Sequence, residues 1–372
     1  MQEPDTSKAD QASNFWGELS VQEFDAFGTM MEAQKIAFGP VAFQVARVAR
    51  RLGIFEKLSE ERCAPRSIAS LATATGLSDY ALEVLLRAAA AAGLVHCSGE
   101  LYNLTAVGRL IQADPLTQVN MDFIHDICFK PLFRLEESIT AGQPSGLGEL
   151  GDWATIYEGL SHLPPGPQQS WLAYDHLYSD SAFPSAQAIV YASGFKALLD
   201  VGGNTGRWLR LCVKRDAQRR YGLFDLPSQI SLARQNLAEL PQAAQVVYHE
   251  GNILDRDCPL PEGYDVLWMS QFLDCFGPAD VVAILGKAYK ALAPGGRLFV
   301  LEVFCDNQDN EVADFVVNMS SPYFTCVANG KSGFHALKAF REFVDASGFS
   351  IAHVYEGLGL GHTLLDLRKR DA

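Results

Sequence analysis

The sequence is poor in positive charge. Its 372 residues include 30 lysines and arginines against 44 aspartates and glutamates, which gives a formal net charge of −14. A chain this acidic repels phosphate backbones and anionic membrane surfaces, so nucleic acids and membranes are disfavoured as partners. No apolar run approaches the roughly 18 residues that a membrane-spanning helix needs. The polar, acid-bearing N-terminus does not resemble a secretion signal.

Paired cysteines and clustered histidines are also missing. The eight cysteines are scattered without a Cys-x-x-Cys pair, and the eight histidines show no metal-ligand spacing. We therefore expect reduced thiols in a cytoplasmic protein that binds no metal. With 48% hydrophobic and 20% charged residues, the composition is that of a globular protein long enough for two or three domains.

The N-terminal third of the chain has helical periodicity. Residues 1–14 are expected to be disordered. Residues 67–111 predict a helix, a turn at Gly76, a second helix, a short hairpin around residues 98–99 and a final helix capped by Thr105. This order is typical of a winged helix, and we assign residues 15–115 to a helical, winged-helix domain.

A winged helix suggests DNA binding, but the charges oppose it. Residues 41–114 hold eight lysines and arginines and seven aspartates and glutamates, without a basic stripe. The second helix is mostly alanine and leucine, whereas a helix that reads bases presents polar side chains. An apolar surface buried against a partner subunit is the better interpretation, so we expect a homodimer.

Residues 116–185 are expected to form helices and loops that contribute to a substrate pocket, with a break at residues 163–170. The aromatic segment that follows either lines the pocket or forms a solvated helix with an aromatic core face. Tyr174 and His176 of this segment, together with His125, are candidate contacts to a substrate.

In the remaining part of the chain, residues 186–372, strands and helices alternate. Five strands separated by helices are predicted, at residues 197–203, 219–227, 245–253, 264–271 and 296–304. A further helix closed by Gly348 and two antiparallel strands follow. We therefore predict an α/β fold with a doubly wound, Rossmann-like sheet, preceded by the helical domain.

The loop after the first of these strands, DVGGNTGRW, lacks two common phosphate-binding motifs. It does not have the spacing Gly-x-Gly-x-x-Gly, which disfavours an NAD-dependent oxidoreductase, and no Gly-Lys-Ser/Thr follows. It does fit acid-x-Gly-x-x-x-Gly, from Asp200, Gly202 and Gly206. Such a loop lets the backbone approach a ligand that has no phosphate to cradle, and the acid suits a positively charged group.

Polar residues end the next strands, at the edge where open parallel sheets bind ligands. Asp225 comes 23 residues after Gly202 and can accept hydrogen bonds from both hydroxyls of a ribose. Asn252 can bond an adenine edge, and Ser270 and Gln271 end the fourth strand. Each signal is weak alone, but the four together, in order and with this spacing, are specific.

These motifs make the chain resemble the S-adenosylmethionine-dependent small-molecule O-methyltransferases of the caffeate and hydroxyneurosporene type. The resemblance covers nearly the whole chain and rests on the winged-helix region and on LLDVGGNTG, FDLP, EGNIL, ALAPGGRLFVLE and FREFVDASGF. It implies S-adenosylmethionine as cofactor, an interlocked homodimer and no metal. It also implies methylation of a hydroxylated aromatic or polyene-type small molecule in secondary metabolism. The cofactor-binding residues that it implies are Gly202, Asp225, Leu226, Asn252, Ile253 and Ser270.

Three positions on the cofactor side depart from the usual residues of the family. Asn204 stands where a third glycine is usual, Asn252 where an aspartate is usual, and Ser270 where a lysine is common.

The catalytic corner departs further. The family has Leu-His-Asp/Asn-Trp before a helix, with the histidine as general base. The aligned residues here are Leu273, Asp274, Cys275 and Phe276, so Asp274 occupies the position of the base. The acid that orients the family's histidine matches Glu302, 28 residues further on. If the two carboxylates face each other, one is expected to hold a proton at neutral pH while the other accepts one.

Other roles are open for these residues. Asp274 can instead cap a helix or form a salt bridge, and Cys275 can be a nucleophile or a buried thiol. Besides His125 and His176, His335 and His362 are other candidate bases. The missing histidine also fits a catalytically altered member of the family that binds S-adenosylmethionine or another ligand as a regulatory protein.

Overall fold

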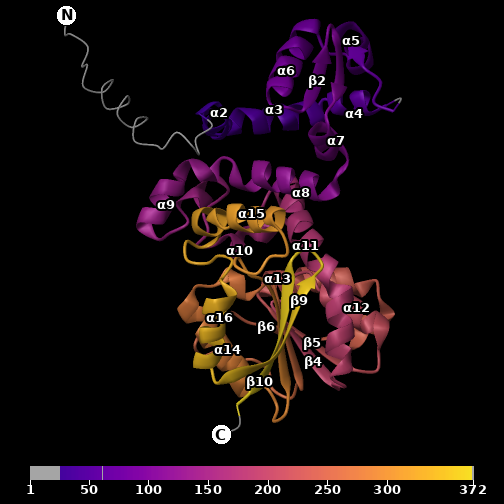
Figure 1. Ribbon diagram of the computed structural model, residues 1–372. Helices are drawn as coiled ribbons and strands as arrows, with labels where there is room; N and C mark the ends of the chain where they lie inside the picture. Colours follow the sequence, from indigo (N-terminus) through magenta and orange to yellow (C-terminus); the bar gives the residue numbers. More distant parts are fainter. Residues whose placement is uncertain (1–25, 61, 371–372) are drawn as a thin grey trace, which may run out of the picture. The chain divides into compact units, whose positions relative to one another are not determined.

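The computed structural model describes residues 26–60 and 62–370. The chain divides between Gln118 and Val119 into two compact units (Figure 1). The division lies within helix α8 (Pro115–Phe123). The segment predicted to be disordered, residues 1–14, lies outside the described residues, as do residues 15–25 of the predicted helical domain.

The first unit combines helices with a three-stranded antiparallel sheet of order β1-β3-β2. The hydroxyl of Thr105 accepts a hydrogen bond from the Gly108 N–H (3.1 Å), and Gly76 ends a helix at φ +74°, which confirms both local predictions. The elements are α2 (Ala26–Ala37), α3 (Gly39–Arg51), α4 (Ile54–Ser59), β1 (Arg66–Ser67), α5 (Ile68–Thr75), α6 (Asp79–Ala91), β2 (Val95–Ser98), β3 (Leu101–Leu104) and α7 (Ala106–Ala113).

Short helices open the second unit. They are the π-helix η1 (Ile124–Cys128), η2 (Pro131–Arg134), α9 (Leu135–Ala141), η3 (Ser145–Glu149), α10 (Ile156–Gly159) and η4 (Leu160–His162). The 28-residue helix α11 (Pro165–Ala192) follows. It begins within the predicted break, because proline is well suited to a first helical turn, and it continues through Pro184 and past residue 185, where the sequence suggested a boundary.

A seven-stranded sheet lies at the centre of the second unit (Figure 1). Its strand order is β6-β5-β4-β7-β8-β10-β9. Its strands are β4 (Ala197–Val201), β5 (Arg220–Asp225), β6 (Val247–Glu250), β7 (Val266–Ser270), β8 (Arg297–Val303), β9 (Phe349–Leu358) and β10 (His362–Lys369). The first five are parallel, and β10 pairs antiparallel with both β8 and the edge strand β9. The predicted doubly wound α/β fold is confirmed.

Helices cover both faces of this sheet. Buried side chains of α14 and α16 pack on one face, and those of α11, α12 and α13 pack on the other. The helices and turns not yet named are α12 (Arg207–Arg215), α13 (Pro227–Ala238), η5 (Pro241–Gln245), η6 (Leu273–Cys275), α14 (Pro278–Ala291), α15 (Glu311–Ser320), η7 (Phe324–Ala328) and α16 (Leu337–Ala346).

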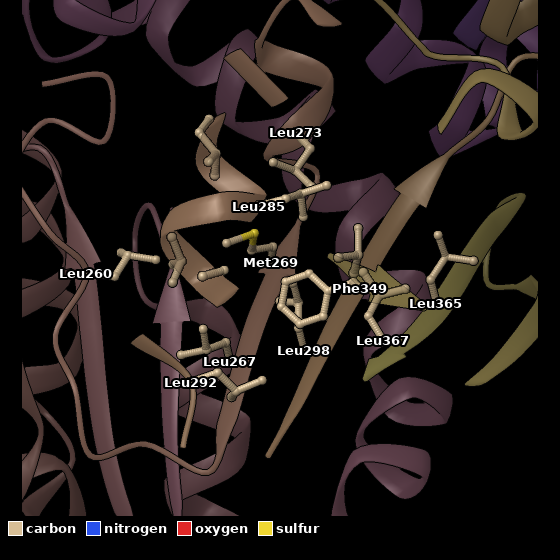
Figure 2. Close-up of a cluster of buried hydrophobic side chains, with 14 of the residues drawn as sticks. Leu260, Leu267, Met269, Leu273, Leu285, Leu292, Leu298, Phe349, Leu365 and Leu367 are labelled. Carbon is tan, nitrogen blue, oxygen red and sulfur yellow. The ribbon is translucent and has the colours of Figure 1, made fainter. Parts of the chain in front are cut away.

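The apolar cluster between the sheet and α14 anchors one functionally important turn. Figure 2 shows this cluster, which includes Met269 of β7, Leu285 of α14 and Leu273 of η6. Leu273 is completely buried. The burial of Leu273 holds the short helix η6 at the carboxyl end of β7, and Asp274 is the next residue of this helix.

Candidate active site

A cavity of about 400 Å³ lies at the carboxyl edge of the parallel strands. The residues that end β4, β5, β6 and β7 contribute to its wall, together with α11 and the segments around residues 155–160 and 323–334. The sequence predicted six cofactor residues, and all of them line this one cavity: Gly202, Asp225, Leu226, Asn252, Ile253 and Ser270.

The glycine loop after β4 depends on residues without side chains. Gly202 has φ +73°, and a Cβ atom there would lie 2.1 Å from the ring of Phe272. A Cβ atom on Gly203 would lie 2.7 Å from the Asp200 carboxylate. The loop therefore reaches this path only with glycine at both positions, and its backbone stays accessible from the cavity.

Asp225 presents an oriented carboxylate to the cavity. Its Oδ2 atom accepts a hydrogen bond from the Asn204 N–H (2.8 Å), and Oδ1 accepts one from the Leu226 N–H (2.7 Å). Burial raises its pKa to about 6, although the two N–H groups act in the opposite direction. Each oxygen keeps a second lone pair for a ligand hydroxyl.

The remaining cofactor candidates have different exposures. Ile253 is buried, and the Ser270 hydroxyl is buried without a hydrogen-bond partner among the described residues. The side-chain oxygen of Asn252 accepts a hydrogen bond from the Leu254 N–H (2.9 Å), so its amide NH₂ group is the part that a ligand can use.

Further polar atoms of the lining are buried and have no partner within the described part of the chain. They are Tyr157 Oη, Asp200 Oδ2, Asn204 Oδ1, Trp208 Nε1, Gln229 Nε2 and Trp268 Nε1. Trp208 of α12 and Trp268 of β7 stack with their ring centroids 3.9 Å apart. Because buried polar groups normally have partners, this lining is built for a ligand with many donors and acceptors.

Asp274 lines the same cavity from η6 and is 5% exposed. Burial raises its pKa to about 7, and the Cys275 thiol lies 3.4 Å from its Oδ1 atom. Among the described residues it forms no salt bridge, and the helix that follows, α14, has Gly277 at its N-cap without a side-chain cap. Neither alternative role of Asp274 is therefore present in the structure.

The backbone of η6 is held by side chains from other elements. Glu302 Oε1 accepts hydrogen bonds from the N–H groups of Phe272 (3.0 Å) and Leu273 (2.8 Å). The Asn329 amide donates to the Cys275 carbonyl (2.6 Å), and His335 Nε2 lies 3.3 and 3.1 Å from the carbonyl oxygens of Leu273 and Phe276. Asp274 is thus presented on a pre-organised turn.

This arrangement changes the role that we expected for Glu302. Glu302 is 2% exposed, and it is not among the residues that line the cavity, because its carboxylate points into the backbone of η6. Burial, and next the neighbouring Asp274, raise its pKa well above the usual value. The Glu302 carboxylate therefore holds the η6 backbone, while Asp274 is the carboxylate that lines the cavity.

The other candidate bases and the candidate nucleophile are less favourably placed. His335 holds η6, and the fully buried His362 lies with Nε2 3.2 Å from the Gln271 side-chain oxygen. His125 is outside the cavity lining, since Phe123 and Ile127, two residues to either side, occupy the apolar side of the helix. The pKa of the Cys275 thiol is raised by burial and by Asp274, which disfavours the reactive thiolate.

Aromatic rings form the wall of the cavity next to Asp274. Tyr174 and His176, both predicted substrate contacts, line the cavity; Tyr174 donates a hydrogen bond to Ser320 (3.1 Å). Trp171 and Tyr323 line it as well, with ring centroids 5.9 Å apart. The aromatic segment of α11 is therefore a pocket wall, and not a solvated helix.

Sequence reasoning missed Tyr157, which comes from the short helix α10. Burial, and next the neighbouring Cys275 and Asp274, raise the pKa of its hydroxyl well above the usual value. Its place beside the candidate base makes it a candidate contact to an acceptor. Only the concentration of aromatic residues between residues 153 and 174 signals this wall in the sequence.

Comparison with known proteins agrees with this geometry. Residues 31–102 match the model of a Dimerisation2-like domain, and residues 176–350 match the model of an O-methyltransferase domain. The chain therefore carries an O-methyltransferase domain, and its curated relatives include two demethylspheroidene O-methyltransferases. It is therefore an S-adenosylmethionine-dependent methyltransferase that combines a dimerisation-type domain with a catalytic domain.

Curated relatives of this methyltransferase include enzymes that act on different atoms. It is 24% identical to the L-tyrosine C(3)-methyltransferase of Streptomyces lavendulae, over 85% of each chain. It is 30% identical to the demethylspheroidene O-methyltransferase of Rhodobacter capsulatus, over 62% of this chain and 56% of that protein. The solved structure of the mitomycin 7-O-methyltransferase MmcR has the same fold, with a TM-score of 0.71 at 22% identity, over 92% of this chain and 98% of that one.

The cavity lining fits the cofactor of the family. Asp225 offers two acceptor oxygens, the buried orphan groups offer further donors and acceptors, and Asp200 adds a carboxylate with one unpartnered oxygen beneath the glycine loop. A ribose, an adenine and an amino-acid zwitterion need such a mixture of partners. Within the described residues, no helix is long and apolar enough to cross a membrane, and no cluster of three His, Cys, Asp or Glu side chains could hold a metal ion.

Proposed function

We propose that this methyltransferase transfers the methyl group of S-adenosylmethionine to a hydroxyl oxygen of an aromatic small molecule, with Asp274 as the general base. The single observation that carries this proposal is the position of Asp274. Its carboxylate lines the same cavity as the polar residues of the sheet edge and the aromatic rings. Polyene-type acceptors remain part of the proposal, since the curated relatives include demethylspheroidene O-methyltransferases.

The cofactor side of the cavity is proposed to bind through its strand-end residues. Asp225 accepts hydrogen bonds from the ribose hydroxyls, and the backbone and side chains of Leu226, Asn252, Ile253 and Ser270 complete this side. When bound, S-adenosylmethionine supplies an electrophilic methyl group on a sulfonium centre. Gly202 keeps the loop backbone close to it.

The acceptor side positions the nucleophile and receives its proton. The rings of Trp171, Tyr174 and Tyr323 hold a planar acceptor, and such positioning lowers the barrier of a displacement reaction by up to about 7–11 kcal/mol. Asp274 then accepts the proton of the acceptor hydroxyl. A carboxylate with a pKa of about 7 is a better base at neutral pH than an ordinary aspartate.

Single-turnover methyl transfer to a panel of phenols tests this mechanism. We expect Asp274→Asn to lower the rate by about 10²–10⁴-fold, while the affinity for S-adenosylhomocysteine is kept. The wild-type rate is expected to rise with pH through about 7, as Asp274 loses its proton, and the variant is expected to lose this dependence. Asp280→Asn is the matched control, because Asp280 lines the same cavity from α14.

Two outcomes contradict the proposal. A rate near that of the wild type in Asp274→Asn excludes Asp274 as the base. No turnover by the wild type with any acceptor favours a regulatory member of the family that binds the cofactor without transferring its methyl group.

We also propose that the protein is a cytoplasmic homodimer, with the dimer formed through its N-terminal domain, residues 15–115. Large apolar side chains of α2 and of the residue that joins it to α3 are exposed in the single chain, among them Phe27 (87%), Ile36 (80%) and Phe38 (62%). All eight cysteines are free thiols, which suits a reducing compartment. Light scattering that shows a monomer at micromolar concentration contradicts the dimer.

A further inference from the structure

Three side chains of α11 contact three positions of the glycine loop and of the first turn of α12. Asp175 Oδ2 accepts a hydrogen bond from the Asn204 amide (3.0 Å), and His176 Nε2 lies 3.1 Å from the Thr205 hydroxyl. Further along both segments, Asp180 forms an ion pair with Arg207. The loop that approaches the cofactor is therefore fastened to the helix that carries the aromatic wall.

Asn204 is the unusual member of these contacts. Its φ of +48° lies in the left-handed region, which side-chain-bearing residues seldom adopt, although asparagine tolerates it better than most. Glycine would adopt this conformation without strain. An asparagine here therefore needs another reason, and the hydrogen bond from its side chain to Asp175 is one that glycine cannot make.

The backbone of Asn204 serves a second partner. Its N–H donates to Asp225 Oδ2 (2.8 Å), while the Leu226 N–H donates to the other oxygen. These two bonds set the plane of the Asp225 carboxylate and determine which lone pairs face the cavity. A rotation of the Asn204 peptide would remove one of them and leave a buried carboxylate underbonded.

We propose that Asp175 is a positioning residue for cofactor binding that acts through Asn204 on Asp225. Asp175 holds the Asn204 side chain, Asn204 then directs its N–H at Asp225, and Asp225 presents its free lone pairs to the ribose hydroxyls. The inference rests on the proposed ribose-binding role of Asp225.

A double-mutant cycle on the affinity for S-adenosylhomocysteine, measured by calorimetry, tests this chain of contacts. Asn204→Gly removes the side chain but keeps the N–H and the left-handed conformation. We expect it to weaken binding about three- to tenfold in the wild-type background and to have no further effect in Asp225→Ala, because its influence passes through Asp225. Thr205→Val is the matched control: it removes the contact to His176 and is expected to act independently of Asp225.

Substitutions of Asp175 separate positioning from a general structural role. Asp175→Ala is expected to reproduce the loss of affinity seen with Asn204→Gly, whereas Asp175→Asn keeps an oxygen that can accept from the Asn204 amide and is expected to restore most of the affinity. The KM for S-adenosylmethionine should rise in Asp175→Ala, while the melting temperature and the kcat at alkaline pH, where Asp274 is ionised in both proteins, stay close to the wild-type values.

The possible failures are distinguishable. Full additivity of Asn204→Gly and Asp225→Ala, or equal losses in Asp175→Ala and Asp175→Asn, overturns the positioning role and leaves the proposed function intact. Unchanged affinity in Asp225→Ala itself removes the ribose assignment and, with it, the inference.

Discussion

The replacement Asp274→Asn is expected to stabilise the protein at alkaline pH while it removes activity. Asp274 is 5% exposed, and burial raises its pKa from 3.8 to about 7. Between these two values the unfolded chain has lost the proton and the folded chain has kept it. The folded state then binds more protons, so the free energy of unfolding falls as the pH rises through this window.

The magnitude follows from the size of the shift. One pKa unit corresponds to about 1.36 kcal/mol, so a rise of about three units costs the wild type about 4 kcal/mol at pH 8. At pH 5, only slightly above 3.8, most of this cost is absent. Because asparagine carries no charge, the advantage of the variant should grow by about 2–3 kcal/mol between pH 5 and pH 8.

Urea unfolding of both proteins at pH 5 and pH 8 measures this difference. Asp114→Asn is the control with the opposite sign, because hydrogen bonds from the Thr117 hydroxyl and N–H lower the pKa of Asp114. Asp114→Asn should be less stable than the wild type, and it should show no gain in stability over the wild type at pH 8. If the stability of Asp274→Asn relative to the wild type is the same at both pH values, the reasoning from burial is refuted.

Three further predictions concern the lining of the cavity and the turn that carries Asp274. Gly202→Ala is expected to weaken cofactor binding and to destabilise the fold by at least about 1–3 kcal/mol, because residue 202 has a positive φ and the new Cβ would meet the ring of Phe272. The control is Gly286→Ala, in which no atom lies within 4 Å of the new Cβ. In a thermal melt its stability should equal that of the wild type or exceed it by up to about 1 kcal/mol. Glu302→Gln keeps an oxygen for the η6 backbone and should lower kcat less than Glu302→Leu, which lacks one; equal kcat values contradict the positioning role. Tyr174→Phe keeps the ring in the aromatic wall and should change the KM of the acceptor but not that of the cofactor; the reverse pattern in initial-rate kinetics would place Tyr174 on the cofactor side.

The sheet and the cofactor side could be predicted because their signals are local in the sequence. Strand β4 has five consecutive buried residues, and the glycine loop follows it directly. In a parallel sheet, the carboxyl ends of all strands lie at one edge. Once the strands are identified in the sequence, Gly202, Asp225 and Asn252, which follow three of these strands, are therefore expected at the same edge. The positions of these residues therefore followed from short windows of sequence.

The acceptor side could be predicted only in part. Tyr157 comes from the short helix α10 and Asn329 directly follows the short helix η7. Neither segment has a repeating pattern, and both residues meet η6 only through long-range packing. The role of Glu302 was also out of reach, because only the structure shows that its carboxylate bonds the η6 backbone. The position of His125 outside the cavity lining was also out of reach, because it depends on the π-helical turn of η1 and on the burial of its neighbours.

The stacked pair of Trp208 and Trp268 also makes the protein its own optical probe. Both indoles belong to the cavity wall, and Trp171 stands on the aromatic side of the same space. Indole emission shifts with the polarity around the ring. Entry of a ligand into the cavity should therefore change the intrinsic fluorescence, so that cofactor and acceptor binding can be followed in real time without any attached label.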